Sequence, residues 1–343
     1  MSTRRLLAAG SALLIALRLV AGPGGTADRL WRAGEAALAD AARSDDPAHT
    51  AVAPVSPPPE PEPAATPAPE ETPVPEETAA PQAAPTTAPD GRAILPASIS
   101  GGMTIKNETD YAPDLAALLS AGPGLSLPSA GPQILIIHTH TSEAYTPDGE
   151  DRYAASGTAR TEDSNYNIVR VGNALSDALT ACGLSVVHDT TIYDYPSYTG
   201  SYSRSGAAVQ AALAANPTIR IVIDLHRDAL SNDDVVYKTV AELPDAACAQ
   251  VMLLVGTNGS GLEHPDWESH LRLAAYLQNA VNAEHPTLMR PIALVNERYN
   301  QHLAPGSILI EVGSSGNTLQ EALRAAELFG ASAGNALAAL IEG

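Results

Sequence analysis

Three short apolar segments of this chain are each followed by a histidine or a carboxylate. His138 and His140 follow the run ILII, His226 follows IRIVIDL, and Glu311 follows SILI. Imidazole and carboxylate groups are the usual ligands of zinc, and a catalytic zinc has three protein ligands and a fourth position for water, whose pKa it lowers to about 7. A further carboxylate outside the ligand set then takes and returns the proton. These residues therefore predict metal-assisted hydrolysis.

The spacing of the residues after the first run suggests a ligand set. His140 and Glu143 are three residues apart, which would place both side chains on one side of a helical turn. With His226 they would form a set of two histidines and one carboxylate, and Glu311 would remain as the general base. Arg227 either stabilises the oxyanion of a tetrahedral intermediate or pairs with a carboxylate of the fold.

The other polar residues are given lesser roles. His138 is expected to orient a ligand from outside the ligand set, and the alternative is that it replaces His140 as a ligand. Ser142 lacks the G-x-S-x-G setting of a serine hydrolase, so a serine nucleophile is not expected. Four more histidines are expected on the surface or in loops: His188, His264, His270 and His285.

The elements that must position these residues alternate between strand and helix. Ile134–Ile137 is a continuous apolar run, as in a strand buried on both faces, and Asn167–Ala181 has apolar residues at helical spacing. We expect further strands at 184–187, 219–225, 251–256 and 307–310, and further helices at 205–216, 267–282 and 319–341. This order predicts an α/β fold with a largely parallel sheet and helices on both faces. Ligand sites in such sheets lie at the carboxyl ends of the strands, where the predicted zinc ligands stand.

The N-terminal segment, residues 1–25, has the features of an export signal. Arg4 and Arg5 precede an apolar run from Leu6 to Leu17, which is shorter than the ~20 residues of an unaided membrane span. We expect the rest of the chain outside the cytoplasm, either anchored to the membrane by this segment or released after cleavage.

The composition then changes twice before the predicted catalytic domain. Residues 26–50 have apolar residues at near-helical spacing and are expected to form a juxtamembrane helix. Residues 51–96 are rich in Pro, Ala, Thr and Glu, which predicts a disordered, semi-extended linker. Residues 97–130 lead into the catalytic domain expected at 131–343.

Charge and cysteine content exclude some classes of protein. The formal net charge of -20 argues against nucleic acid as a partner, because sequence-independent binding depends on lysine and arginine at the phosphates. Cys182 and Cys248 are too few for a disulfide scaffold in a chain of 343 residues. Both are expected to be small buried hydrophobic residues rather than a disulfide bridge.

From about Gly131 to its C-terminus, the chain resembles the stage II sporulation protein P family of peptidoglycan hydrolases, which is related to zinc-dependent N-acetylmuramoyl-L-alanine amidases. The resemblance rests, in this order, on HTHTSEAY, NIVRVGNAL, IRIVIDLHRDA, VGTNGSGLEHPDW and RYNQHLAPGSILIEVGSSGNTLQEA. It implies hydrolysis of the amide between the muramic acid lactyl group and L-alanine of the stem peptide, with endopeptidase activity in some members. It also implies association with the stage II sporulation proteins D and M during engulfment of the forespore.

The same resemblance implies a zinc ion held by His140, a carboxylate and His226. In the related amidases the carboxylate opens the first helix, and the matching region here, RTEDSNYNIV, contains Glu162 and Asp163. Glu143 is the assignment adopted, and these two residues remain the alternatives.

The resemblance also implies that Glu311 is the catalytic base. Tyr299, Asn300 and Gln301 are expected to line the substrate groove, and a simple turn before Pro305 is the alternative. Two other functions compete with the amidase: a wall-binding scaffold of the sporulation septum without catalysis, and a zinc carboxypeptidase or deacetylase with the same ligands.

Overall fold

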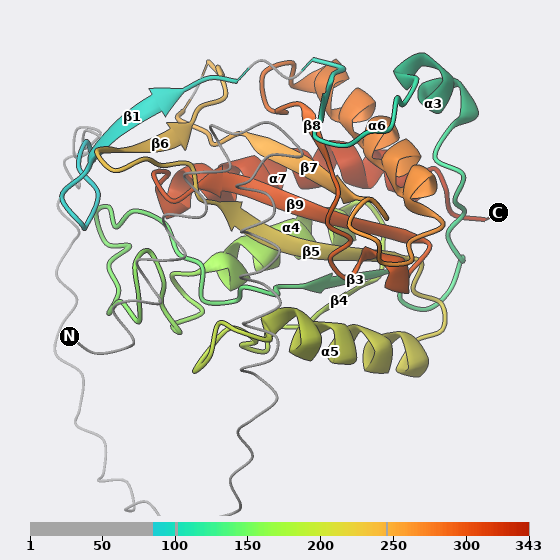
Figure 1. Ribbon diagram of the computed structural model, residues 1–343, viewed down its shortest axis with the longest axis horizontal. Helices are drawn as coiled ribbons and strands as arrows, with labels where there is room; N and C mark the ends of the chain where they lie inside the picture. The colour runs from blue at the N-terminus through green and yellow to red at the C-terminus, as the bar shows by residue number, and fades with distance from the viewer. Residues whose placement is uncertain (1–84, 100–101, 245, 343) are drawn as a thin grey trace, which may run out of the picture. The chain divides into compact units, whose positions relative to one another are not determined.

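The computed structural model describes residues 85–99, 102–244 and 246–342 (Figure 1). The predicted signal or anchor, the juxtamembrane helix and most of the predicted linker lie outside these residues. Among the helices of the described residues, none combines the length and the apolar character needed to cross a membrane.

The fold is built on a seven-stranded sheet with the order β2-β8-β7-β9-β5-β3-β4 (Figure 1). Neighbouring strands are parallel except for β7 and β9, which are antiparallel. The predicted, largely parallel sheet is therefore confirmed. Because β3, β4, β5 and β9 run in the same direction, their carboxyl ends lie at one edge. The strands are β2 (Ile105–Asn107), β3 (Ile134–Ile137), β4 (Val186–His188), β5 (Ile221–Asp228), β7 (Val251–Gly256), β8 (Ile292–Val295) and β9 (Gly306–Ser314).

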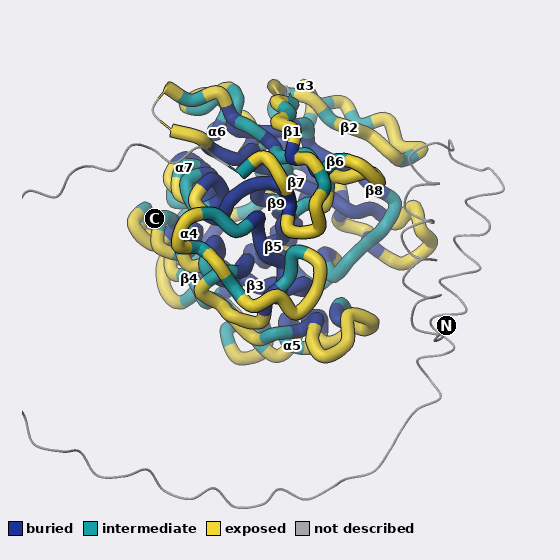
Figure 2. The backbone as a smooth tube through the Cα atoms, turned by 90° about the vertical axis from the view of Figure 1, so that its left-hand side faces the viewer, coloured by how far each residue is buried: buried dark blue, intermediate teal, exposed yellow. Residues whose placement is uncertain are grey.

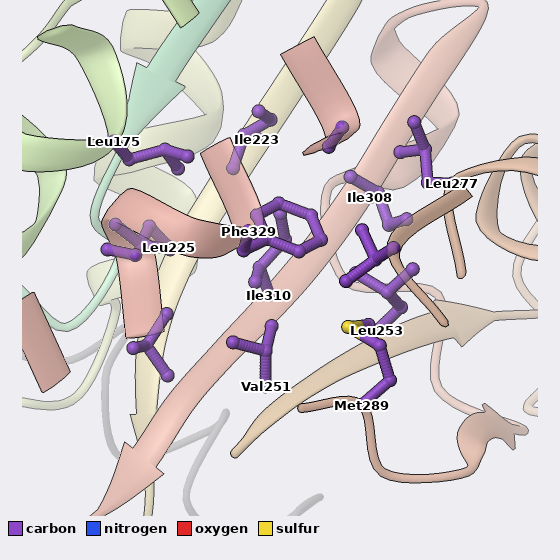
Figure 3. Close-up of a cluster of buried hydrophobic side chains, with 14 of the residues drawn as sticks. Leu175, Ile223, Leu225, Val251, Leu253, Leu277, Met289, Ile308, Ile310 and Phe329 are labelled. Carbon is purple, nitrogen blue, oxygen red and sulfur yellow. The ribbon is translucent and has the colours of Figure 1, made fainter. Parts of the chain in front are cut away.

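Helices cover both faces of this sheet, as the alternating pattern predicts. The main core contains Ile223 and Leu225 of β5 together with side chains of three helices, and Phe329 lies among them (Figure 3). A second cluster joins Val222, on the opposite side of β5, to Val209 of the fourth helix. The three helices are α4 (Ile168–Ala181), α6 (Trp267–Glu284) and α7 (Leu319–Ala338), and the fourth is α5 (Ser201–Ala215).

Burial follows from this layering. The backbone of the central strands is largely buried, whereas the outer surfaces of the helices are exposed (Figure 2). All four residues of β3 are buried, as expected for a strand with helices on both sides. The sheet is therefore rigid beneath the edge where the predicted ligands stand.

Several short elements were not predicted from the sequence. β1 (Ala93–Ala97) pairs in parallel with β6 (Val235–Thr239) in a separate two-stranded sheet, so the boundary expected at residue 96 lies inside a strand. The lead-in segment contains β2 and α3 (Leu115–Ala121), and the segment after Asn300 forms the 3-10 turn η1 (Gln301–Leu303). Strands of three to five residues have too few positions to show a clear alternation of apolar and polar side chains.

Candidate metal and hydrolytic site

The parallel strands bring the predicted residues to one edge of the sheet. In the pairing of β5 with β9, His226 is the direct partner of Glu311. The ring of His140, which follows β3, lies with its centroid 5.3 Å from that of His226. Nδ1 of His226 is 3.5 Å from Oε2 of Glu143. Residues separated by up to 171 positions therefore meet because three strands end together.

Glu143 is buried and ionised. It is 6% exposed, and the backbone N–H of Arg227 donates a hydrogen bond to its Oε2 at 3.0 Å. Burial alone would raise the pKa of Glu143, but the contact with His226 and the charge of Arg227 hold this pKa well below its usual range. By contrast, the alternative ligands Glu162 and Asp163 are exposed, and Asp163 accepts hydrogen bonds within its own turn. The geometry therefore favours Glu143 over both alternatives.

His226 lies between two carboxylates. Its Nε2 is 2.9 Å from Oδ1 of Asp224, which is close enough for an ion pair, although the angle does not suit a hydrogen bond. Its Nδ1 faces Glu143. Burial opposes protonation, but Asp224 and Glu143 together raise the pKa of His226 well above its usual value. Asp224 also accepts hydrogen bonds from the backbone N–H of Thr139, at 2.8 Å, and from its hydroxyl, at 2.6 Å.

Sequence reasoning missed Asp224. It is 8% exposed and stands two residues before His226 on β5, so the strand alternation places both side chains on one face. The signal was present as the D-x-H spacing in IDLHRD. Its contacts join the strand that carries His226 to the loop after β3.

His140 is held by residues of the β4–α5 connection. Its Nε2 lies 2.9 Å from the hydroxyl of Tyr198, whose ring stacks on the imidazole with centroids 4.4 Å apart. Its Nδ1 lies 3.4 Å from Oγ of Ser201. Burial lowers the pKa of His140 to about 4, so the ring is neutral at pH 7. No pattern in the sequence indicated Tyr198.

Glu311 is half-buried, but its Oε2 is shielded from solvent and has no hydrogen-bond partner. Burial, followed by the nearby charge of Asp228, raises the pKa of Glu311 to about 8. A buried carboxylate with an unused oxygen and a raised pKa has the properties of a general base.

The metal-ligand prediction can be tested against the arrangement of the donors. Among residues 85–99, 102–244 and 246–342, no three His, Cys, Asp or Glu side chains are grouped closely enough to hold a metal ion. Two imidazoles and a carboxylate nevertheless match zinc in type, and Nδ1 of His226 already faces Glu143. Nε2 of His140, however, is in contact with Tyr198. The donor types of these three residues suit zinc, and their role as ligands stays a prediction.

Arg227 does not have the geometry predicted for an oxyanion donor. Its guanidinium donates hydrogen bonds to the carbonyl oxygens of Asp228, at 3.1 Å, and Ala159, at 3.0 Å, and the residue is 5% exposed. The side chain is therefore used within the fold. Arg160 is a second cation near Glu143, and its Nη2 is 3.5 Å from Oε1 of Glu143. Arg160 was missed because only the tertiary fold pairs it with Glu143.

The three residues predicted to line the substrate groove have different surroundings. Gln301 is 4% exposed and bonds the backbone of β7 with both amide atoms, and its place in the groove stays a prediction. Asn300 donates hydrogen bonds to the carbonyl of Tyr202 and the hydroxyl of Ser205 in α5. Tyr299 has a φ of 52°, and its ring lies 5.5 Å from that of Tyr202, which in turn stacks near His226. All three residues line one small pocket together with Thr139 and Asp224, and their role in binding substrate stays a prediction.

His138 contacts the strand rather than a ligand ring. Its Nδ1–H donates to the carbonyl of Leu225 at 2.9 Å, and its Nε2 therefore accepts from Nε2–H of His188 at 2.8 Å. It therefore supports the residue immediately before His226. α4 packs closely here, because a Cβ added at Gly172 would lie 2.6 Å from Nε2 of His138.

The remaining histidine and cysteine predictions need partial correction. His264 lies in the loop before α6, as predicted, although it is buried and bonded to His270 at 3.0 Å. His270 is buried within α6, so its assignment to the surface or a loop was wrong. Nε2 of His270 also bonds the carbonyl of Ala304, which explains how a polar ring is accommodated in the interior. Both cysteines are free, as predicted; Cys248 is buried and Cys182 is half-buried.

Residues 65–332 match the sequence model of the family described as stage II sporulation protein P. The chain belongs to this family. A relative of the same name from Bacillus subtilis (strain 168) is 29% identical over 206 residues, which cover 56% of this chain and 48% of the relative. The chain thus spans about half the length of the curated relative it matches, and the family resemblance stated from the sequence is confirmed.

Solved structures of N-acetylmuramoyl-L-alanine amidases are also similar to the chain. AmiC2 of Nostoc punctiforme is 14% identical with a TM-score of 0.32, and covers 62% of this chain and 96% of its own. An amidase of Clostridium difficile 630 is 14% identical with a TM-score of 0.35, and the match covers 62% of this chain and 95% of that amidase. The CwlD amidase of Clostridioides difficile, solved in complex with the GerS lipoprotein, is 13% identical with a TM-score of 0.34. The match covers 61% of this chain and 98% of the CwlD chain. At these TM-scores the likeness carries no conclusion about activity.

Proposed function

We propose that this chain is a zinc-dependent peptidoglycan hydrolase of the N-acetylmuramoyl-L-alanine amidase type. The observation that carries the proposal is the meeting of His140, Glu143 and His226 with the unpartnered carboxylate of Glu311 at one edge of the sheet. Membership of the stage II sporulation protein P family supports it. Endopeptidase activity on cross-links is part of the proposal for the same site.

The residues of the chain would divide the work between binding and proton transfer. His140, Glu143 and His226 would hold the zinc, which when bound polarises the scissile carbonyl and lowers the pKa of water. Oε2 of Glu311 takes a proton from the attacking water as oxygen bonds to the carbonyl carbon. It then returns that proton to the amide nitrogen as the C–N bond breaks. The raised pKa of Glu311 suits both transfers, because it lies near neutral pH.

The decisive experiment identifies the bond that is cleaved. The purified chain with zinc is incubated with purified peptidoglycan, and the released fragments are analysed by mass spectrometry. An amidase releases stem peptides with a free L-alanine amine from intact glycan strands. Loss of a terminal amino acid or of acetate would instead identify a carboxypeptidase or a deacetylase. No release at any zinc concentration, with retained binding to peptidoglycan, would favour a wall-binding scaffold.

A ligand variant connects this activity to the metal. We expect His226→Ala to lose both zinc, measured by metal analysis of the purified protein, and fragment release, because an open zinc site depends on each of its three protein ligands. His285→Ala is the matched control, since His285 lies at the C-cap of α6. Full zinc content in His226→Ala would contradict the ligand assignment.

The location and partners of the chain are proposed with the same function. We propose that the catalytic domain acts outside the cytoplasm, attached through the N-terminal segment, and works with the stage II sporulation proteins D and M during engulfment. Co-attachment at one membrane would raise the effective concentration of enzymes that share a substrate. Protease accessibility in intact sporulating cells tests the location, and co-isolation with proteins D and M tests the partners. Normal engulfment in a deletion strain without a redundant copy would contradict this role.

A further inference from the structure

Tyr198 makes a direct side-chain contact with a predicted metal ligand. Its hydroxyl is 2.9 Å from Nε2 of His140, and its ring stacks on the imidazole at an interplanar angle of 15°. The guanidinium of Arg160 lies 5.0 Å from the centroid of the same tyrosine ring. Tyr198 is nevertheless 56% exposed, so it lies at the solvent side of the site rather than in the core.

The segment that carries Tyr198 is held on both sides. Before it, Asp194 forms an ion pair with Arg160 and accepts hydrogen bonds from Ser142. After it, Arg204 of α5 donates to the carbonyls of Ser197 and Thr199. These anchors keep the tyrosine beside His140, at the solvent side of the site.

The contacts of the two ring nitrogens indicate which one would bind a metal. Nδ1 of His140 points to Oγ of Ser201, which is 3% exposed, whereas Nε2 points to the exposed Tyr198. A metal-bound histidine usually donates its other ring N–H to a protein acceptor, and Ser201 is placed to be that acceptor. Nε2 then carries the only lone pair of the neutral ring, and the hydroxyl of Tyr198 donates its hydrogen to it.

We propose that Tyr198 is a further residue of the active site: its hydroxyl caps Nε2 of His140 in competition with a metal ion, and once released from that nitrogen it binds the substrate's carbonyl oxygen. The hydroxyl must leave Nε2 before a metal can bind there. Because its anchored segment keeps it at the solvent side of His140, it is then the phenol donor beside the reacting carbonyl. Such a donor stabilises the negative charge that develops on that oxygen.

The test compares three proteins: wild type, Tyr198→Phe and Tyr195→Phe. Phenylalanine keeps the stacked ring and removes only the hydroxyl. Tyr195 is the matched control, because it is a tyrosine of the same segment, 47% exposed. Zinc affinity is measured by competition titration of the metal-free proteins, and turnover is measured separately on purified peptidoglycan. Circular dichroism confirms that all three are folded.

We expect Tyr198→Phe to bind zinc about 2- to 10-fold more tightly, because a competing hydrogen bond of ordinary net strength is lost. We also expect its kcat to fall about 10²-fold with little change in KM, as for loss of an oxyanion donor. Tyr195→Phe should match wild type in both measurements. Unchanged or weaker zinc binding by Tyr198→Phe would overturn the capping contact, and unchanged kcat would overturn the substrate contact.

The substrate contact rests on the proposed function, whereas the capping contact does not. If the wild-type protein released no peptidoglycan fragments but Tyr198→Phe still bound zinc more tightly, the proposed hydrolase would be wrong and the capping contact would stand.

Discussion

Among the residues of this site, Glu311 is expected to transfer protons without binding the metal. Glu311→Gln keeps the size of the side chain and removes the proton acceptor, so we expect turnover on peptidoglycan to fall about 10²- to 10⁴-fold. Zinc content should stay that of wild type, because Glu311 is not in the expected ligand set. Glu327→Gln, at an exposed position of α7, is the control. Loss of zinc would make Glu311 a ligand, and full turnover would exclude it as the base.

The raised pKa of Glu311 also predicts a pH effect on folding stability. The pKa of Glu311 is about 8 in the folded protein against 4.5 for an ordinary glutamate, so between these pH values the folded state holds a proton that the unfolded state has lost. Stability is therefore fully present below the lower pKa and is lost as pH rises through the higher one. Glutamine does not ionise, so Glu311→Gln should gain Tm relative to wild type as the pH rises.

Thermal unfolding in the presence of a chelator measures this effect without the contribution of metal. Between about pH 5 and about pH 8 we expect the Tm difference between Glu311→Gln and wild type to change by at least about 2–4 °C, the equivalent of about 1 kcal/mol for a domain of this size. Glu327→Gln should show no such trend. A Tm difference that is constant across this range would mean that Glu311 ionises normally in the folded protein.

Asp224 is expected to act through His226. Its carboxylate contacts Nε2 of that ring and receives two hydrogen bonds from Thr139. Loss of such a supporting carboxylate typically costs about 10- to 100-fold in metal affinity, so Asp224→Asn should weaken zinc binding by that factor. Competition titration measures it, with Asp177→Asn on the exposed side of α4 as the control. Unchanged affinity would show that the 2.9 Å contact does not support the ligand.

At the scale of elements, the packing of α4 against the sheet edge depends on Gly172. A Cβ there would lie 2.6 Å from Nε2 of His138 and 2.7 Å from Nε2 of His188. The gain in helix propensity from Gly172→Ala, about 1 kcal/mol, is therefore opposed by overpacking that costs about 1–3 kcal/mol and by disturbance of the histidine pair.

We expect the cost to exceed the gain, so Gly172→Ala should lower the Tm in thermal unfolding by several degrees, at about 2–4 °C per kcal/mol. Gly157→Ala is the control, because the nearest atoms to its added Cβ would be 3.7 Å away. A raised Tm for Gly172→Ala would show that the edge of the sheet adjusts easily and that the histidine pair does not restrain it.

At the scale of the whole molecule, charge limits the kinds of partner. The sequence has 19 lysine and arginine residues against 39 aspartate and glutamate residues. At physiological salt, proteins that bind DNA non-specifically do so with Kd values of about 10⁻⁴–10⁻⁶ M, through lysine and arginine at the phosphates. We expect no saturable binding of this chain to labelled duplex DNA in fluorescence anisotropy. Saturable binding that weakens with added salt would reveal a basic surface that the net charge conceals.

The sequence alone determined the order of the principal elements and three residues of the site. Apolar runs and helical spacing are local patterns, so they identified β3, β5, β7, β9 and the helices α4, α5, α6 and α7. His140, His226 and Glu311 could be named because each stands at or near the end of such a run, and the carboxyl ends of parallel strands share an edge. Five matching segments in one order were enough to name the family without a structure.

Only the tertiary structure decided the contacts between distant segments. The reversal of β7 relative to β9 depends on strand pairing across the sheet, which no local pattern records. The same is true of Arg160 beside Glu143 and of Tyr198 on His140, where loops far apart in the sequence meet. Hydrogen bonding likewise turned Gln301 inward, because its amide satisfies backbone groups of β7 that burial would otherwise leave unpaired. A side chain's type is local information, whereas its partner is decided by packing.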